Sequence, residues 1–257
     1  MPLGNGELRK ISDNVYVCSP ALSFVQSVET MGLVESLLYG HLLCGTYALS
    51  ASRGATVSRP PLLATGELAD FISNHGGARN VRRAQAAAAL LLDDSASPME
   101  SALAIRLVVP RRLGGMGLDP ASISLNHRVE VPSRFVPLLN ARHLRIDAFF
   151  PSQNVGLEYD SIAFHSGSEK IEHDIRRRTV LEGMGIRTIA VTRGQILDTG
   201  EFHGLDEAVS RLLGRRVRRK SVTQRERDHE LTMLLRRALS RFDADVQEAG
   251  RFMASLR

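Results

Sequence analysis

Three acidic residues lie in two short segments that alternate in the manner of β-strands. Asp147 stands among apolar neighbours in HLRIDAFF, and Glu158 and Asp160 are two residues apart in VGLEYD. Because alternate residues of a strand share a face, we expect Glu158 and Asp160 on the same side of a sheet. Carboxylates gathered on one patch disfavour each other's ionised form unless a cation compensates them. The usual compensator is a hard cation that prefers oxygen ligands, so the pattern predicts a site for Mg²⁺ or Mn²⁺.

Further residues flank these strands in a definite order. They are Ser97-Pro98-Met99-Glu100 before the acids and, after them, His165, Asp174-Ile175-Arg176-Arg177, Leu181, Gly185 and RTIAVT, which ends at Thr192. This order and spacing resemble the PD-(D/E)xK nuclease superfamily, in particular its very-short-patch-repair-like branch, much of which consists of domains of unknown function. The resemblance covers about residues 95 to 200. It implies a restriction-endonuclease-like fold and a metal-dependent endonuclease that hydrolyses phosphodiester bonds of DNA.

The resemblance also implies roles for individual residues. Asp147 and Glu158 are the principal metal ligands, and Glu100 and Asp160 support them or bind a second ion. The expected catalytic residues are Asp147, Glu158, Asp160, His165 and Arg177. Without the family pattern, these acids are equally well described as surface carboxylates on the open face of an antiparallel sheet.

One position departs from the wider superfamily. A lysine usually stands two residues after the second acid, whereas this chain has Asp160 there. The missing proton-transfer or charge-stabilising role falls to His165, Lys170 or Arg177, and the sequence leaves these three open. Arg177 also has a second interpretation, because Asp174 lies three residues before it and the two can form an ordinary ion pair on a helix surface.

The elements that position these residues predict an α/β fold with a mixed sheet flanked by helices. Ser97 and Pro98 start a helix. The segments SLNHRVEV, HLRIDAFF and VGLEYD follow as an antiparallel meander, a helix spans Lys170 to Met184, and RTIAVT adds a parallel strand. We expect three regions: a mainly helical one over residues 1–94, the nuclease-like core over 95–200, and a basic helical extension over 201–257.

Composition narrows the class of protein. The chain has 257 residues, of which 43% are apolar, so it can bury a globular core. No run is apolar enough for a membrane helix, and MPLGNGELRK lacks the apolar centre of a signal peptide, so we expect a cytoplasmic protein. Cys18 and Cys44 have neither C-x-x-C spacing nor a histidine pair, and we expect two buried free thiols.

The net charge of +5 favours a polyanionic partner. Much of it lies in RRVRRK, which predicts contacts to a DNA backbone by Arg215, Arg216, Arg218, Arg219 and Lys220. Such a run is also typical of an ordinary solvated basic surface. Because aromatic residues make up only 5% of the chain and tryptophan is absent, a stacking surface for single strands is not indicated, and duplex DNA is the expected partner.

Two other kinds of function compete with the nuclease. Similar cores are found fused to AbiEi-type antitoxin segments, and VYVCSP with the helices after it resembles the part that joins such segments to the core. This resemblance implies a DNA-binding or regulatory protein with weak or no catalysis. The N-terminal helices also suit a protein partner, and the sequence does not predict the oligomeric state. The chain lacks the P-loop, nucleophile-elbow and H-E-x-x-H motifs.

Overall fold

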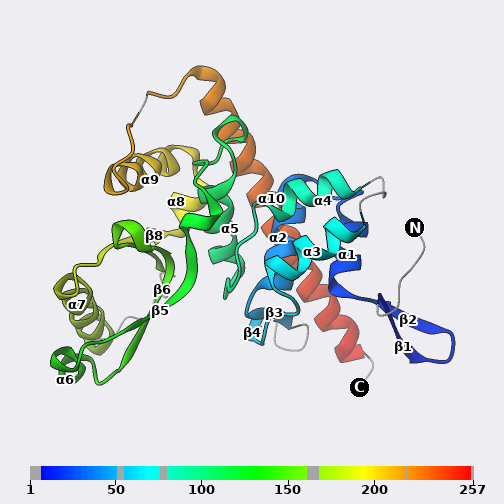
Figure 1. Cartoon of the computed structure of the whole chain (residues 1–257), viewed down its shortest axis with the longest axis horizontal. Coiled ribbons are helices and arrows are strands. Elements are labelled where there is room, and N and C mark those ends of the chain that lie inside the picture. The colour runs from blue at the N-terminus through cyan, green and yellow to red at the C-terminus, as the bar shows by residue number, and fades with distance from the viewer. Residues whose placement is uncertain (1–6, 51–54, 76–79, 161–167, 218, 256–257) are drawn as a thin grey trace. The chain divides into compact units, whose positions relative to one another are not determined.

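The computed structural model describes residues 7–50, 55–75, 80–160, 168–217 and 219–255 (Figure 1). The chain forms two compact units. The first contains residues 1–101 and 234–257, and the second contains residues 102–233. This division differs from the three consecutive regions that we expected, because the basic C-terminal extension is shared between the two units.

The first unit combines helices with two β-hairpins. Its described strands are β1 Leu8–Ser12, β2 Val15–Cys18, β3 Tyr47–Ser50 and β4 Ala55–Ser58. Its helices before residue 98 are α1 Pro20–Ser27, α2 Leu33–Cys44, α3 Thr65–Asn74 and α4 Val81–Ala88. Strand β1 pairs with β2 and β3 pairs with β4, both antiparallel. The unit is therefore mainly helical, with two small sheets formed by residues 8–18 and 47–58.

The sequence predicts most of these helices but not both hairpins. The run VYVC predicts a strand, which is β2. Pro20 predicts a helix start, which is that of α1, and there the Ser19 hydroxyl accepts a hydrogen bond from the Leu22 amide. The sequence predicts a second helical segment up to about Tyr47, but α2 ends at Cys44. The turn-rich stretch from Ser50 to Pro61 predicts a loop, and this prediction is wrong because the stretch contains β4.

The core of the first unit is built from the apolar faces of its helices. Fully or almost fully buried members are Phe24 of α1, Leu37 of α2, Ile72 of α3 and Ala84 of α4. His41 of α2 is also fully buried; its Nδ1 atom lies 2.9 Å from the Leu37 carbonyl oxygen. Within the described residues, His41 Nε2 is a buried polar atom that makes no hydrogen bond. Burial lowers the pKa of His41 to about 4.

The second unit contains a four-stranded mixed sheet. Its strands are β5 Ser124–Glu130, β6 His143–Phe150, β7 Val155–Asp160 and β8 Arg187–Thr192. They lie in the order β5-β6-β7-β8, with β5, β6 and β7 antiparallel and β8 parallel to β7. Helix α5 Pro98–Val108 precedes the sheet, and helix α7 Ser168–Gly183 connects β7 to β8. The expected α/β class, the antiparallel meander and the parallel fourth strand are confirmed.

Helix α7 and the short helix α6 Val136–Leu139 pack on the sheet (Figure 1). Their shared core joins Leu144 and Ile146 of β6 to Val180 and Leu181 of α7. The spacing of Ile171, Ile175 and Leu181 predicts an apolar side of α7, but Ile171 and Ile175, in its first half, remain 52% and 60% exposed. Among the side chains of α7 that the structure describes, those of the second half are therefore the ones held by apolar packing.

The end of the sheet leads into further helices, α8 Arg193–Leu197, α9 Thr199–Leu212 and α10 Val222–Ser255. Leucines at helical spacing predict an apolar side of α10. The structure confirms this in part, because Leu231, Leu235 and Leu239 are buried whereas Leu234 is 51% exposed. No helix in the described part of the chain is both long and apolar enough to cross a membrane.

A buried ionic network ties α9 and α10 together in the second unit. Lys220 Nζ lies 2.9 Å from Asp206 of α9 and 2.5 Å from Asp228 of α10. Arg111 forms a second ion pair with Asp206, at 3.2 Å. Burial raises the pKa of Asp206, but Lys220 and Arg111 outweigh that effect and bring it below its ordinary value. The network compensates carboxylates that would be costly to bury alone.

Candidate active site

Asp147 and Glu158 stand opposite one another where strands β6 and β7 separate. The last backbone pairs between these strands are Phe149 with Gly156 and Ala148 with Leu157, so the next position along places Asp147 opposite Glu158. There the Tyr159 amide donates a hydrogen bond to Asp147 Oδ2 at 2.7 Å. A side-chain carboxylate thus takes the place of the next backbone partner. Both acids are half-buried, which keeps them partly open to ligands.

The backbone of β5 is unusual opposite Asp147. Strand β5 pairs Leu125 with Ala148 and His127 with Ile146, which leaves Asn126 opposite Asp147. Asn126 has a φ of 46°, in the left-handed region that non-glycine residues seldom adopt within a strand. Asparagine tolerates this conformation better than most residues. Local strain of this kind concentrates at functional sites, and here it marks the strand position beside the acid pair.

Arg177 of α7 binds Glu158 with two nitrogens. Its Nη2 atom lies 2.5 Å from Glu158 Oε1, and its Nε atom lies 3.4 Å from Oε2. The same Nη2 also donates to the backbone carbonyl of Arg145 in β6. Arg177 therefore bridges the opening between β6 and β7, and its guanidinium supplies the positive charge that Glu158 needs.

The neighbouring residues of β7 lie on different faces. Asp160 is exposed at the end of the strand, opposite Thr192 of β8, and the spacing of two places it on the same face as Glu158. Tyr159 lies on the other face, beside Arg193 at the start of α8. Burial raises the pKa of the Tyr159 hydroxyl, and the hydrogen bond and charge of Arg193 oppose that rise.

Glu100 has a local structural role in α5. Its carboxylate accepts hydrogen bonds from the Ala96 amide and the Ser97 hydroxyl, both at 2.9 Å, while the Ser97 hydroxyl accepts one from the Glu100 amide at 3.2 Å. This reciprocal arrangement resembles a capping box, although the Glu100 carboxylate accepts from the amide of Ala96 instead of that of Ser97. Glu100 belongs to the first unit, whereas Asp147 and Glu158 belong to the second. Its role as a metal ligand stays a prediction.

Three other residues predicted near the site are His165, Lys170 and Asp174. His165 and the side chain of Lys170 lie outside the described part of the chain. Asp174 is 3.8 Å from His173 on the exposed side of α7, and Arg177 turns to Glu158 instead. Of the two interpretations of Arg177, a surface pair with Asp174 and a position beside the acids, the structure has the second.

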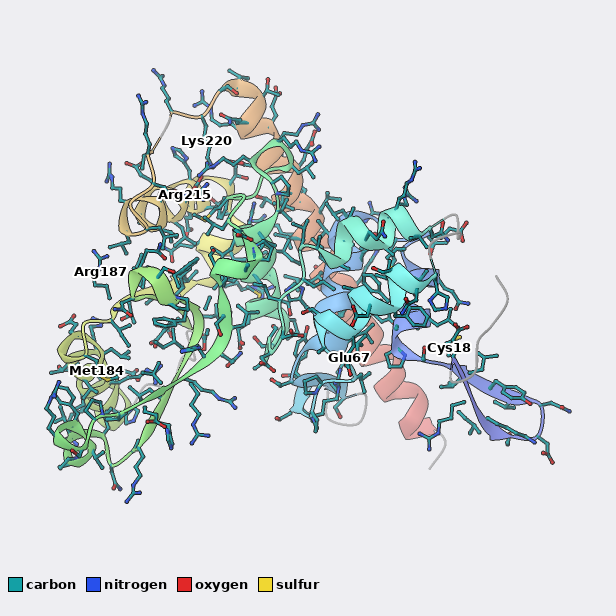
Figure 2. All side chains as sticks on the ribbon, viewed as in Figure 1. Cys18, Glu67, Met184, Arg187, Arg215 and Lys220 are labelled. Carbon is teal, nitrogen blue, oxygen red and sulfur yellow. The ribbon has the colours of Figure 1, made fainter. Side chains whose placement is uncertain are left out.

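The basic segment between α9 and α10 divides into exposed and buried residues. Arg215, Arg216 and Arg219 are exposed, although Arg215 also donates to the Met116 carbonyl at 3.5 Å. Lys220 is only 8% exposed and is held by the two aspartates of the ionic network (Figure 2). Arg218 is not among the described residues. As a correction to the expectation, Lys220 is occupied within the fold and is not part of the exposed basic surface.

Asp147 and Glu158 are the candidate ligands of a metal ion. Among the described residues, no group of three or more aspartate, glutamate, histidine or cysteine side chains is arranged to hold a metal ion. A Mg²⁺ ion, however, often takes only one or two carboxylates and completes its octahedron with water and phosphate oxygens. Asp147 and Glu158, opposite one another on β6 and β7, supply the two carboxylates of this smaller requirement, provided that Arg177 releases Glu158.

Comparisons with known proteins identify no relative of this chain. The chain matches no protein-family model, no curated protein and no solved structure. Function therefore has to be argued from the geometry of the acids, the arginine and the basic surface.

Several of these features were missed by the sequence analysis. The Tyr159 amide, the carbonyl of Arg145 and the conformation of Asn126 are backbone properties, which residue types do not reveal. Arg193 follows Thr192 directly, and its closeness to Tyr159 depends on the β7–β8 register. The sequence did contain one usable signal, since Ser97 and Glu100 have the S-x-x-E spacing of a capping box.

Proposed function

We propose that this protein is a metal-dependent endonuclease that hydrolyses phosphodiester bonds of DNA on a restriction-endonuclease-like core. The observation that carries the proposal is the position of Asp147 opposite Glu158, at the point where two adjacent strands separate. The order of elements, α5, three antiparallel strands, α7 and a parallel strand, supports it. The paired acids lie on strands of a sheet and are therefore rigidly positioned, as a catalytic site requires.

In this proposal the carboxylates of Asp147 and Glu158 hold a Mg²⁺ or Mn²⁺ ion, with Asp160 as a nearby supporting acid. Such an ion, when bound, polarises a phosphodiester and lowers the pKa of a bound water. The two strands fix the acids relative to each other, and the bond from the Tyr159 amide orients Asp147. His165 and Lys170 remain candidates for proton transfer, beside Arg177.

In this proposal Arg177 acts both in the free protein and when DNA is bound. In the free protein its guanidinium neutralises Glu158. A phosphate group presents the same paired oxygens as a carboxylate, and arginine binds both in a bidentate manner. When DNA arrives, Arg177 exchanges Glu158 for the phosphate, and Glu158 becomes free to hold the cation. Binding of DNA and of metal would then assist each other.

The test is cleavage of supercoiled plasmid and of labelled duplex DNA in Mg²⁺ or Mn²⁺, with EDTA as the metal-free control. Asp147→Asn and Glu158→Gln are expected to abolish nicking, because each removes one charge from the pair while keeping its size. Glu182→Gln, a change at an exposed position of α7, is the matched control and should cleave like the wild type. Cleavage that survives both changes in the pair would refute the proposed site.

A second function has one observation in its favour. Glu158 already has a cation in Arg177, so the fold needs no metal to compensate this acid. The protein would then be a DNA-binding or regulatory protein of antitoxin type that keeps the sheet without catalysis. Salt-sensitive DNA binding that is unchanged by EDTA, with no cleavage in any divalent ion, would favour this function over the first.

A further inference from the structure

Two arginines stand directly opposite one another on the β5–β6 hairpin. Arg128 of β5 pairs with Arg145 of β6, and both side chains are exposed. The next pair, Val129 with Leu144, contributes to the core beneath α6 and α7. Because neighbouring residues of a strand point to opposite faces, the two arginines lie on the face of the hairpin that this core does not cover.

This pairing is unfavourable on its own. Like charges directly opposite on neighbouring strands destabilise a sheet. In the part of the chain that the structure describes, neither guanidinium forms an ion pair or a hydrogen bond. The acids closest along the same strands are Glu130, which stands opposite His143, and Asp147, which accepts the Tyr159 amide. The two like charges thus stand side by side, and the described residues give neither of them an ion-pair partner.

The arginine pair adjoins the candidate active site. Arg145 is two residues before Asp147 on the same strand, a separation of about 6.6 Å along extended chain. The backbone carbonyl of Arg145 also accepts a hydrogen bond from Arg177, which binds Glu158. Arg177 therefore links the strand segment that carries Arg145 to Glu158. An anion held by the two arginines would lie close to Asp147 and Glu158.

We propose that Arg128 and Arg145 bind the sugar-phosphate backbone of the nucleic acid strand whose neighbouring phosphodiester reaches Asp147 and Glu158. This inference rests on the proposed function for the role of the two acids. Guanidinium groups match phosphate oxygens in a bidentate manner. An acidic protein segment fits less well, because its carboxylates would lie against the carboxylates of the site, where a phosphodiester can share a metal ion with them.

The binding surface is thus distinct from the basic segment between α9 and α10. That segment contributes exposed arginines away from Asp147 and Glu158 in the sequence, which suits general attraction to a polyanion. The pair on β5 and β6 instead fixes where a bound strand crosses the sheet. Its contacts are to phosphates, so it positions the strand without reading base sequence.

The test is the salt dependence of binding to fluorescently labelled duplex DNA, measured by anisotropy in EDTA so that no cleavage occurs. Each phosphate contact adds about 0.9 to the slope of log affinity against log salt concentration. The double variant Arg128→Gln with Arg145→Gln should lower that slope by about 1.8 and weaken binding roughly tenfold or more at low salt. Arg82→Gln with Arg237→Gln, two exposed arginines of the first unit, makes the same charge change and should leave the slope unchanged.

One further double variant and one further ligand decide between explanations of a changed slope. Arg128→Lys with Arg145→Lys keeps both charges and should retain most of the slope, which separates lost contacts from lost folding. An unchanged slope in the Gln variant, or an equal loss in the Arg82 and Arg237 control, would overturn the proposal. Equally tight binding of polyglutamate that depends on the same pair would overturn the choice of a phosphodiester. Because binding is measured without metal, the pair can pass this test even if the protein cleaves no DNA, and can fail it even if cleavage is observed.

Discussion

Arg177 of α7 donates to both carboxylate oxygens of Glu158 on β7, through Nη2 at 2.5 Å and Nε at 3.4 Å. The contact joins the helix to the sheet at the position where β6 and β7 separate. The side chains of Arg177 and Glu158 are 21% and 28% exposed, so water screens their attraction only in part. The ion pair links α7 to the sheet. In it, Arg177 competes with any metal ion for the carboxylate of Glu158.

Removal of Arg177 should therefore increase affinity for a metal ion in the absence of DNA. In Arg177→Gln, Glu158 has no guanidinium partner and can bind Mn²⁺ directly, so we expect a severalfold lower dissociation constant in calorimetry. The same variant should bind DNA more weakly, because the phosphate loses its bidentate partner. Arg176→Gln is the matched control, since Arg176 pairs with exposed Glu172 on the outer side of α7. Equal Mn²⁺ affinity in wild type and Arg177→Gln would contradict the competition.

Two substitutions at Asp147 should separate its structural and chemical roles. Asp147→Asn keeps an oxygen that can accept the Tyr159 amide, so we expect stability close to that of the wild type. Asp147→Ala leaves that amide without its acceptor, which should cost about 1–2 kcal/mol of unfolding free energy. Urea unfolding followed by circular dichroism measures both. If Asp147→Asn were destabilised as strongly as Asp147→Ala, the charge rather than the hydrogen bond would hold β6 to β7.

The sheet was predictable because each of its strands has a clear local signal. RTIAVT and VGLEYD combine β-branched and apolar residues, and both form the expected strands. The hairpin β3–β4 was not predictable from such signals. Its strands have four residues each, and the glycine, serine and proline residues around β4 favour a loop. Strand β1 is exposed along its whole length, so it lacks the buried alternation on which strand prediction depends.

The site was predictable in its acids but not in their partners. The spacing of Glu158 and Asp160 fixes their common face within one strand. The contact of Arg177 with Glu158 depends on how α7 packs against β7, which no local pattern specifies. The same limit applies to Lys220. A run of basic residues predicts a surface, whereas Asp206 and Asp228, on two different helices, bury this lysine between them.

Lys220 should matter for stability far more than its basic neighbours. Lys220→Met leaves Asp206 and Asp228 buried without this cation, and we expect a loss of about 3–5 kcal/mol of unfolding free energy. Arg216→Met, a change at an exposed position of the same segment, should stay within about 0.5 kcal/mol of the wild type. Thermal unfolding followed by circular dichroism provides the comparison. Similar losses in the two variants would show that the ionic network does not stabilise the second unit.

His41 should make the first unit sensitive to acid. Burial lowers its pKa from 6.5 to about 4, so between these pH values the unfolded chain binds a proton that the native ring does not. The unfolding free energy should therefore fall as the pH decreases from 6.5 to 4, by roughly 3 kcal/mol in all. His41→Leu removes this contribution and should flatten the pH profile, whereas His203→Leu, at an exposed position, should not. A profile equally steep in His41→Leu would assign the acid sensitivity to other groups.

The most direct measurement of the central claim is the initial rate of nicking of supercoiled plasmid in Mg²⁺ by wild-type protein and by Glu158→Gln. If Asp147 and Glu158 hold the metal ion for phosphodiester hydrolysis, the wild type nicks the plasmid only when Mg²⁺ is present, and Glu158→Gln falls to the rate measured in EDTA. Equal rates in the two proteins, or no Mg²⁺-dependent nicking by the wild type, would contradict the account.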